Sequence, residues 1–256
     1  MKSITILIPY SDNKIGELNF TLNNLAYNWE KLVNYNFELL IFIQCLKNNS
    51  DPSNELLSLV KKYKKIFKEL NNSNLKFKFQ KDAGIYDAIN KAINNIFSIY
   101  VVICGAGDSL ELNTINKLSM ENYDPFSIHI FNTKFRFSKK IIKSPKGNRL
   151  AFHNICQQSI LYKTKILKKY KFNNLYKIQA DYFWNLKYLR LIPNKYHDEV
   201  LGIYNETEGI SKNKNIIDKE FFKVKTNLVI QNFSILIAVF EFLYRMLIRI
   251  KRFIIS

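Results

Sequence analysis

The feature that most constrains the fold is a regular alternation, over the first 110 residues, of short apolar runs and amphipathic patterns. The runs at residues 4–9, 38–43 and 99–104 are rich in Ile, Leu and Val, and runs of this length and composition predict buried strands. A fourth run, residues 75–79, alternates apolar and basic side chains, which predicts a strand with one wet face. The buried runs indicate a mainly parallel sheet with helices on its faces.

The segments between these strands show helical spacing. Apolar side chains recur at helical intervals over residues 18–32, 56–70 and 85–96, which predicts three amphipathic helices. Asp51 followed by Pro52 predicts the start of the second one, as an N-cap and a proline at the first helical position.

The order of these elements also predicts where a ligand binds. In open parallel sheets the ligand lies beyond the carboxyl ends of the strands. We therefore expect the loops at residues 10–13, 44–51 and 105–109 to meet around it.

The second half of the chain is less regular. We expect strands over residues 127–132 and 134–142 and a turn or flexible loop over 144–149. The composition changes after residue 211, which predicts one domain over residues 1–211 and a helical extension over 212–256.

The composition excludes several classes of protein. The chain is 47% hydrophobic and carries a formal charge of +18, so it can bury a core and is not disordered. Such a charge requires a negative partner: nucleic acid, an anionic membrane or phosphorylated small molecules. The lysines are spread among asparagines without a zinc-finger or RNP-type motif, so we expect no nucleic-acid partner.

The cysteines and the N-terminus point to a reducing compartment. The three cysteines, at positions 45, 104 and 156, form no CxxC pair, which argues against a disulfide framework and a zinc site. The first apolar run is too short for a secretion signal. We expect a cytoplasmic protein.

Three stretches carry residues suited to chemistry. In KDAGIYDAINKAI, Gly84 allows a sharp strand-to-helix junction, and Asp87 and Lys91 share the polar side of the helix; a capped, solvated helix explains the same pattern. In CGAGDSL, Asp108 follows a buried strand, where it is either a ligand of a hard cation or a turn residue. In IQADYFW, Asp181 is either an N-cap or a general base.

Together these stretches resemble the family-2 glycosyltransferases. In chain order, PYSDN, NNSD, KDAGIYDAINKAI, GAGD, CQQS and QADYFWNLK are similar to motifs of the polysaccharide-building subgroup, and GIYDAINKAI is the most specific match. The resemblance covers residues 3–211 and implies an α/β fold of the GT-A type, with a Rossmann-like nucleotide-binding half and a mixed central sheet. It also implies transfer of a sugar from a nucleotide-sugar, with inversion, to a glycan acceptor in surface polysaccharide biosynthesis.

The resemblance assigns roles to particular residues. Asp181 is the expected general base, and Asp108 is expected to bind Mg²⁺ or Mn²⁺ on the diphosphate. Gln157 and Gln158 are placed in the acceptor or donor-sugar pocket. The remaining nucleotide-sugar contacts implied are Pro9, Tyr10, Asp82, Gly84, Asp87 and Lys91.

Three positions depart from the family pattern. Gln44 stands near the place of an Asp, Gly107 replaces the first Asp of the metal motif, and Gln157 replaces a His. A non-catalytic scaffold that keeps the fold is therefore the alternative to an active enzyme.

The last 25 residues form a separate pattern. Residues 232–256 are too short and too charged to span a bilayer, and at about 100° per residue their polar side chains fall on one narrow arc. The pattern and its basic end predict an in-plane helix on an anionic membrane surface, at the inner face of the cell membrane and beside a lipid-linked acceptor. A helix packed on the domain or in a dimer is the alternative. The polar arc consists of Ser234, Glu241, Arg245, Arg249 and Arg252.

Overall fold

The computed structural model describes most of the 256 residues. The described ranges are 2–11, 14–32, 37–47, 52–70, 73–120, 124, 126–207 and 219–255.

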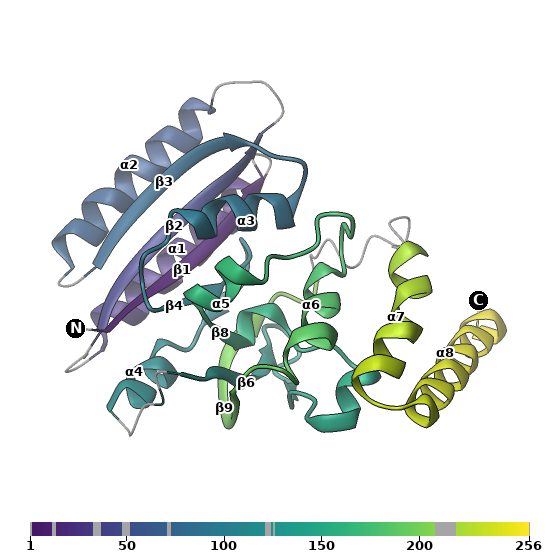
Figure 1. Cartoon of the computed structure of the whole chain (residues 1–256). Helices are drawn as coiled ribbons and strands as arrows, with labels where there is room; N and C mark the ends of the chain where they lie inside the picture. Colours follow the sequence, from purple (N-terminus) through teal and green to yellow (C-terminus); the bar gives the residue numbers. More distant parts are fainter. Residues whose placement is uncertain are drawn as a thin grey trace.

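The first half alternates strands and helices as the sequence predicts. Its strands pair in parallel in the order β3-β2-β1-β4, with helices between them (Figure 1). The predicted mainly parallel, helix-covered sheet is confirmed for this half. Its elements are β1 (Lys2–Ser11), α1 (Ile15–Glu30), β2 (Phe37–Lys47), α2 (Asn54–Glu69), β3 (Ser73–Lys81), α3 (Ile85–Asn94) and β4 (Tyr100–Ile103).

The start of α2 differs from the prediction. The N-cap is Ser53, whose side chain accepts a hydrogen bond from the backbone N–H of Leu56 at 3.2 Å. Pro52 therefore precedes the helix, and Asp51 lies outside the described residues. A hydroxyl two positions later caps the free N–H groups of the first turn.

The second half extends the sheet with antiparallel and parallel pairs. β8 (Ile160–Lys163) pairs antiparallel with β4 and with β6 (Ile128–Phe135), and β6 runs parallel to β9 (Asn194–Tyr204). β5 (Ser109–Leu110) closes the far edge against β9. The result is one mixed sheet over the described residues.

One predicted strand boundary was wrong. β6 runs through the expected break at residue 133, and only β7 (Ile141–Ile142) returns to pair with it. The backbone of Thr133 takes part in this antiparallel ladder, so a polar residue does not end the strand.

Two hydrophobic clusters cover the two faces of the sheet. Alternate residues of β4 belong to different clusters. Tyr100 and Val102 pack on the side of α1 and α2, and Val101 and Ile103 pack on the side of α3. This period of two is what a strand buried on both faces requires. The second cluster also holds α5 (Thr164–Lys169) and α6 (Ala180–Tyr188).

Two helices end the chain. α7 (Lys219–Asn232) packs on α6, where Phe221 is fully buried against Tyr182. α8 (Ile235–Ile255) pairs with α7 at the end of the molecule farthest from β3 (Figure 1). Among the described residues, no helix combines the length and the apolar character needed to cross a membrane.

Candidate active site

A pocket of about 450 Å³ lies beyond the carboxyl ends of β1 and β4, where Pro9 and Ile103 form part of its lining. This is the position predicted from the parallel sheet. The predicted loop at residues 105–109 contributes to the lining. Residues 12–13 and 48–51 of the other two loops lie outside the described residues.

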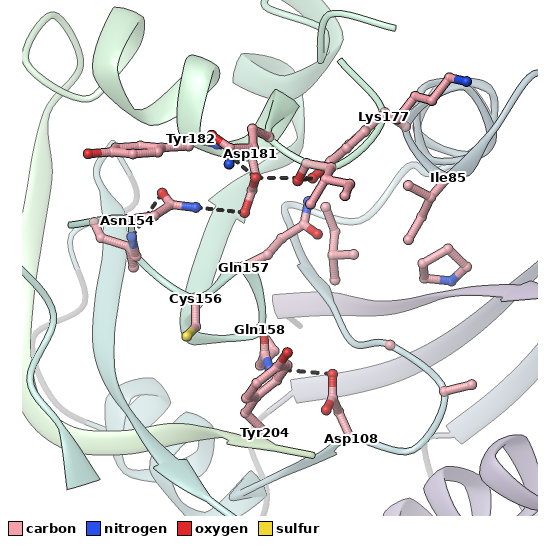
Figure 2. Close-up of a pocket in the computed structure, with 18 of the residues that line it drawn as sticks. Ile85, Asp108, Asn154, Cys156, Gln157, Gln158, Lys177, Asp181, Tyr182 and Tyr204 are labelled. Carbon is pink, nitrogen blue, oxygen red and sulfur yellow. Dashed lines mark hydrogen bonds between the residues drawn. The ribbon is translucent and has the colours of Figure 1, made fainter. Parts of the chain in front are cut away.

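Four predicted site residues other than Pro9 meet in this pocket. Asp108, Gln157, Gln158 and Asp181 all line it. Figure 2 shows the two carboxylates at opposite ends, with the glutamines between them. Gln157 and Gln158 come from the 3₁₀ turn η2 (Gln157–Ser159), which precedes β8.

The Asp108 carboxylate is buried and held on both oxygens. Oδ1 accepts a hydrogen bond from the backbone N–H of Asn205 at 2.7 Å, and Oδ2 accepts one from Gln158 at 3.3 Å. Burial raises its pKa to about 7, and the negative charge of Glu17 adds to this while the hydrogen bonds and Arg136 oppose it. A carboxylate whose ionisation is this costly is suited to a positive ligand.

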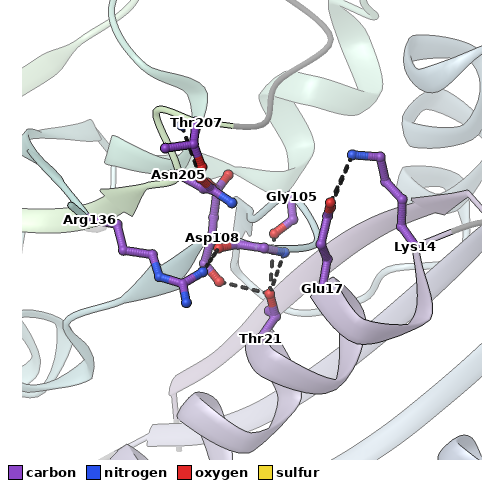
Figure 3. A network of polar contacts seen from close by, with 9 residues as sticks. Lys14, Glu17, Thr21, Gly105, Asp108, Arg136, Asn205 and Thr207 are labelled. Atoms are coloured by element: carbon purple, nitrogen blue, oxygen red, sulfur yellow. Dashed lines mark hydrogen bonds and ion pairs between the residues drawn. The ribbon is translucent and has the colours of Figure 1, made fainter.

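The loop that carries Asp108 has a fixed shape. Thr21 on α1 accepts a hydrogen bond from the N–H of Gly107 at 2.9 Å and donates one to the carbonyl of Asp108 at 2.8 Å (Figure 3). Gly107 has φ +95°, and a Cβ atom on Gly105 would lie 2.9 Å from Asp108 Oδ2. The glycine at position 107 thus fits a backbone conformation that an Asp there would strain.

Two cations lie near the same end of the pocket. Lys14 lines the pocket and forms an ion pair with Glu17 at 3.1 Å. Arg136, which follows β6, lies near Asp108 in Figure 3 and donates to the carbonyl of Gly107 at 3.3 Å. Its guanidinium stacks 3.4 Å from the ring centroid of Phe20. The charges of the two cations offset those of Glu17 and Asp108, and their N–H groups are of the kind that bind phosphate oxygens.

At the other end, Asp181 lies in the first turn of α6. Its Oδ1 accepts hydrogen bonds from the backbone N–H of Tyr182 at 2.8 Å and from the hydroxyl of Tyr86 at 3.0 Å. Its Oδ2 accepts a hydrogen bond from Asn154 at 2.9 Å (Figure 2). Burial raises its pKa to about 6, although all three hydrogen bonds oppose the shift. A carboxyl with this pKa is suited to take a proton near neutral pH.

Gln157 offers an unused donor to a ligand. Its Nε2 is buried and has no hydrogen-bond partner among the residues the structure describes. Because a buried N–H without an acceptor is costly, its place on the pocket wall favours a ligand oxygen as the partner.

The other predicted contacts do not line this pocket. Tyr10 is 1% exposed and packs in the core on the α1 side. Asp87 pairs with Lys91 at 2.7 Å, and Asp82 accepts from the N–H of Gly84 at 3.3 Å. Gly84 does adopt the unusual backbone expected of it, with φ +137°. The proposed contacts of these five residues with a nucleotide remain predictions.

Comparison with solved structures identifies the architecture. The structure of S. aureus TarS 1–349 in complex with UDP-GlcNAc superposes with a TM-score of 0.64, at 15% identity, over 91% of this chain and 68% of that one. The chain has the GT-A fold. The GT-A mannosyltransferase PcManGT from Pyrobaculum calidifontis, solved with GDP-Man and Mn²⁺, gives a TM-score of 0.53 at 14% identity over 90% of this chain and 63% of its own.

Comparison with known sequences finds relatives that match only part of the chain. No protein-family model matches the chain. A PGL/p-HBAD biosynthesis glycosyltransferase of Mycobacterium bovis and one of Mycobacterium tuberculosis are each 29% identical over 154 residues. The match covers 56% of this chain and 58% of these relatives, so it spans little more than half of their length.

A divalent cation could bind in this pocket at the Asp108 carboxylate. No cluster of three or more His, Cys, Asp or Glu suited to a metal occurs in the described part of the chain. Asp108 is instead a single buried carboxylate in a pocket, which matches a Mg²⁺ or Mn²⁺ ion bound by one or two carboxylates and by phosphate oxygens. The diphosphate of a donor would have to supply the other ligands.

Sequence reasoning missed four residues of this site. Tyr86 lies inside the GIYDA stretch and Asn154 inside the polar HNICQQS stretch, so both carried a signal that was assigned to their neighbours. Lys14 and Arg136 stand in ordinary lysine-rich and aromatic sequence. Only the tertiary structure brings them to Asp108.

Proposed function

We propose that the protein is an inverting glycosyltransferase that moves a sugar from a nucleotide-sugar to a hydroxyl of a glycan. The observation that carries the proposal is one GT-A pocket with the buried carboxylate of Asp108 at one end and the half-buried carboxylate of Asp181 at the other, each with a raised pKa. The mycobacterial relatives named as glycosyltransferases support the same reaction class.

At the acceptor end, Asp181 acts as the general base. As the acceptor oxygen attacks the anomeric carbon, the carboxylate takes its proton, and the bond from that carbon to the diphosphate oxygen breaks. Base and leaving group lie on opposite sides of the sugar, so a single displacement inverts the configuration. Asn154 and Tyr86 hold the carboxylate in place during this step.

At the donor end, positive charge stabilises the departing nucleoside diphosphate. Lys14 and Arg136 lie beside Asp108 and are placed to meet phosphate oxygens. A Mg²⁺ or Mn²⁺ ion on Asp108 would supply further stabilisation of the charge that develops on the leaving group. Gln157 is placed to donate to an oxygen of the sugar.

We further propose that the acceptor is lipid-linked, that the product belongs to a surface polysaccharide, and that the enzyme works at the cytoplasmic face of the membrane. The exposed apolar side of α8 supports a location at a lipid surface. We propose no nucleic-acid partner, because the two ends of the pocket are organised around carboxylates.

A thermal-shift screen of nucleotide-sugars with and without Mn²⁺ tests the donor and the metal. A ligand at 100 times its Kd should raise the melting temperature by roughly 5–10 °C for a chain of this size. The increase should need Mn²⁺ or Mg²⁺ and should be lost in Asp108→Asn, since that variant keeps the shape but loses the charge.

Asp198→Asn is the matched control, because Asp198 is exposed on β9 and does not line the pocket. It should respond to the donor as the unchanged protein does. If no nucleotide-sugar stabilises the protein with either metal, the enzyme proposal fails and a non-catalytic scaffold is favoured.

A further inference from the structure

The last helix turns its apolar side away from the protein. Ten large apolar side chains of α8 are exposed, and the six nearest the middle of this face are 47–67% exposed. This apolar face is defined by Leu236, Val239, Phe240, Leu243, Leu247 and Ile250. A surface helix of a water-soluble domain normally buries its apolar stripe against the core. α8 does the reverse, and its exposed apolar side chains extend from Ile235 to Ile250 among the residues that the structure describes.

Buried charges set this orientation. Glu241 is fully buried and pairs with Lys225 of α7 at 2.6 Å and with Arg245 at 2.9 Å. Arg245 also donates to the hydroxyl of Thr226 at 2.9 Å. Rotating α8 to bury its apolar face would expose or separate these charges, and breaking a buried ion pair is strongly unfavourable. Glu241 and Arg245 of the polar arc predicted from the sequence therefore face α7, whereas the side chains of Arg249 and Arg252 lie outside the described part of the structure.

We propose that the apolar face of α8 is an in-plane docking surface for an anionic lipid bilayer. In this arrangement the folded domain lies on the water side, the ion pairs of Glu241 hold the helix to it, and the apolar face enters the headgroup boundary. The proposal extends the proposed function by giving its lipid-linked acceptor a location. Lipid binding itself requires neither donor nor transfer.

Charge favours lipid over a second copy of the chain. Residues 219–255 contain seven lysines and arginines but only two glutamates. A symmetric dimer through this face would bring two such excesses together, on chains that each carry a formal charge of +18, and like charges repel. Lys225 and Arg245 are paired with Glu241, but anionic headgroups attract the other five lysines and arginines, by about 1 kcal/mol for each one near the surface.

The docking surface adjoins the acceptor end of the pocket. The ring of Tyr244 on α8 contacts the rings of Phe152 and His153, with centroids 5.7 and 5.9 Å apart. The next residue, Asn154, lines the pocket and donates to Asp181. A membrane bound to α8 would therefore lie next to the end of the pocket that holds the general base.

Co-sedimentation with vesicles tests the surface directly. The full chain is mixed with phosphatidylcholine vesicles with and without phosphatidylglycerol, in the absence of any nucleotide-sugar. Binding should require phosphatidylglycerol. The double variant Leu243→Glu/Leu247→Glu should weaken binding by more than about tenfold, because it removes apolar burial and adds negative charge.

Phe97→Glu/Leu191→Glu is the matched control. Both side chains are highly exposed, at 85% and 73%, and neither lies on α8. This variant has the same change in charge and should bind the vesicles like the unchanged chain. Circular dichroism and the donor-induced thermal shift confirm that each variant folds, and they keep a failure of lipid binding distinct from a failure of the proposed transferase.

Two results would overturn the proposal. One is equal vesicle binding by the α8 variant and its control. The other is that the unchanged chain does not bind the vesicles and sediments as a dimer, while the variant with the two α8 substitutions sediments as a monomer. That second result would assign the apolar face to a second copy.

Discussion

At the scale of single residues, two carboxylates define the site because each is costly to ionise where it lies. Asp108 is buried near Glu17, and Asp181 is half-buried and accepts hydrogen bonds from Tyr86 and Asn154. Burial disfavours the charged form of a carboxyl group, and a nearby positive ligand favours it. The first residue is thereby suited to a cation and the second to a proton.

Replacing Asp181 with Asn should remove the base and leave the binding site intact. The amide has the same shape as the carboxyl, but it cannot take the proton of the acceptor hydroxyl. We expect kcat to fall by about 10²–10⁴-fold with little change in donor affinity. Steady-state kinetics and calorimetric donor binding measure the two quantities. Full activity of Asp181→Asn, next to an equally active Asp198→Asn, would show that another group is the base.

At the scale of elements, the short loop between β4 and β5 determines where Asp108 points. Its backbone is held by Thr21 of α1 and by Arg136, and Gly107 within it has φ +95°. Similarly, η2 places both glutamines on the pocket wall just before β8. Neither element contains a charged side chain other than Asp108.

The Gly107→Ala substitution tests this loop. Alanine at φ +95° is strained and its Cβ would lie 3.2 Å from Asn205, so we expect a loss of about 1–2 kcal/mol of unfolding free energy together with weaker donor binding. Gly16→Ala serves as the comparison, since a Cβ there meets no atom within 4 Å and alanine favours the helix. Urea unfolding measures the stability of both variants. Equal stability of the two variants would contradict the assigned role of the loop.

At the scale of the whole molecule, one sheet joins two halves that bring different groups to the pocket. The parallel half supplies Pro9, Lys14 and Asp108, and the second half supplies Gln157 and Asp181. Global unfolding releases all of them at once, so the ionisation of a single buried group affects the stability of the entire chain.

The pH dependence of stability follows from Asp181. Its pKa is about 6 in the folded chain against 3.8 for the ordinary value, so the folded state binds more protons between these values. Stability should therefore fall as pH rises from about 4 to 6, and the fall should continue to about 7 because Asp82 and Asp108 have pKa values raised to about 6 and about 7. Chemical unfolding at a series of pH values should show this decrease in the unchanged protein and a smaller one in Asp181→Asn. Asp124 and Glu206 have pKa values lowered to about 2, so their ionisation changes stability mainly below pH 4. Parallel pH curves for the two proteins would show that Asp181 ionises freely in the folded state.

Much of the fold follows from the sequence, because strands and helices in the first half are specified by local patterns. Apolar runs of the right length gave β1, β2 and β4, and helical spacing gave α1 to α3. The expected pocket at the carboxyl ends of the strands needed only these elements. Asp108 and Asp181 were found because each directly follows or begins a recognisable element. By contrast, Lys14 and Arg136 have no local pattern that marks them.

The tertiary structure decided the rest, because it depends on contacts between residues far apart in the chain. The sequence by itself determined that α8 is amphipathic and that its polar residues share one arc. Which side faces outward was decided by the buried pairing of Glu241 with Lys225, sixteen residues earlier on another helix. In the same way, Arg136 reaches the Asp108 loop because β6 and β5 both pair with β9, which brings the end of β6 close to that loop. Local periodicity specifies elements, and long-range ion pairs and packing specify how those elements face one another.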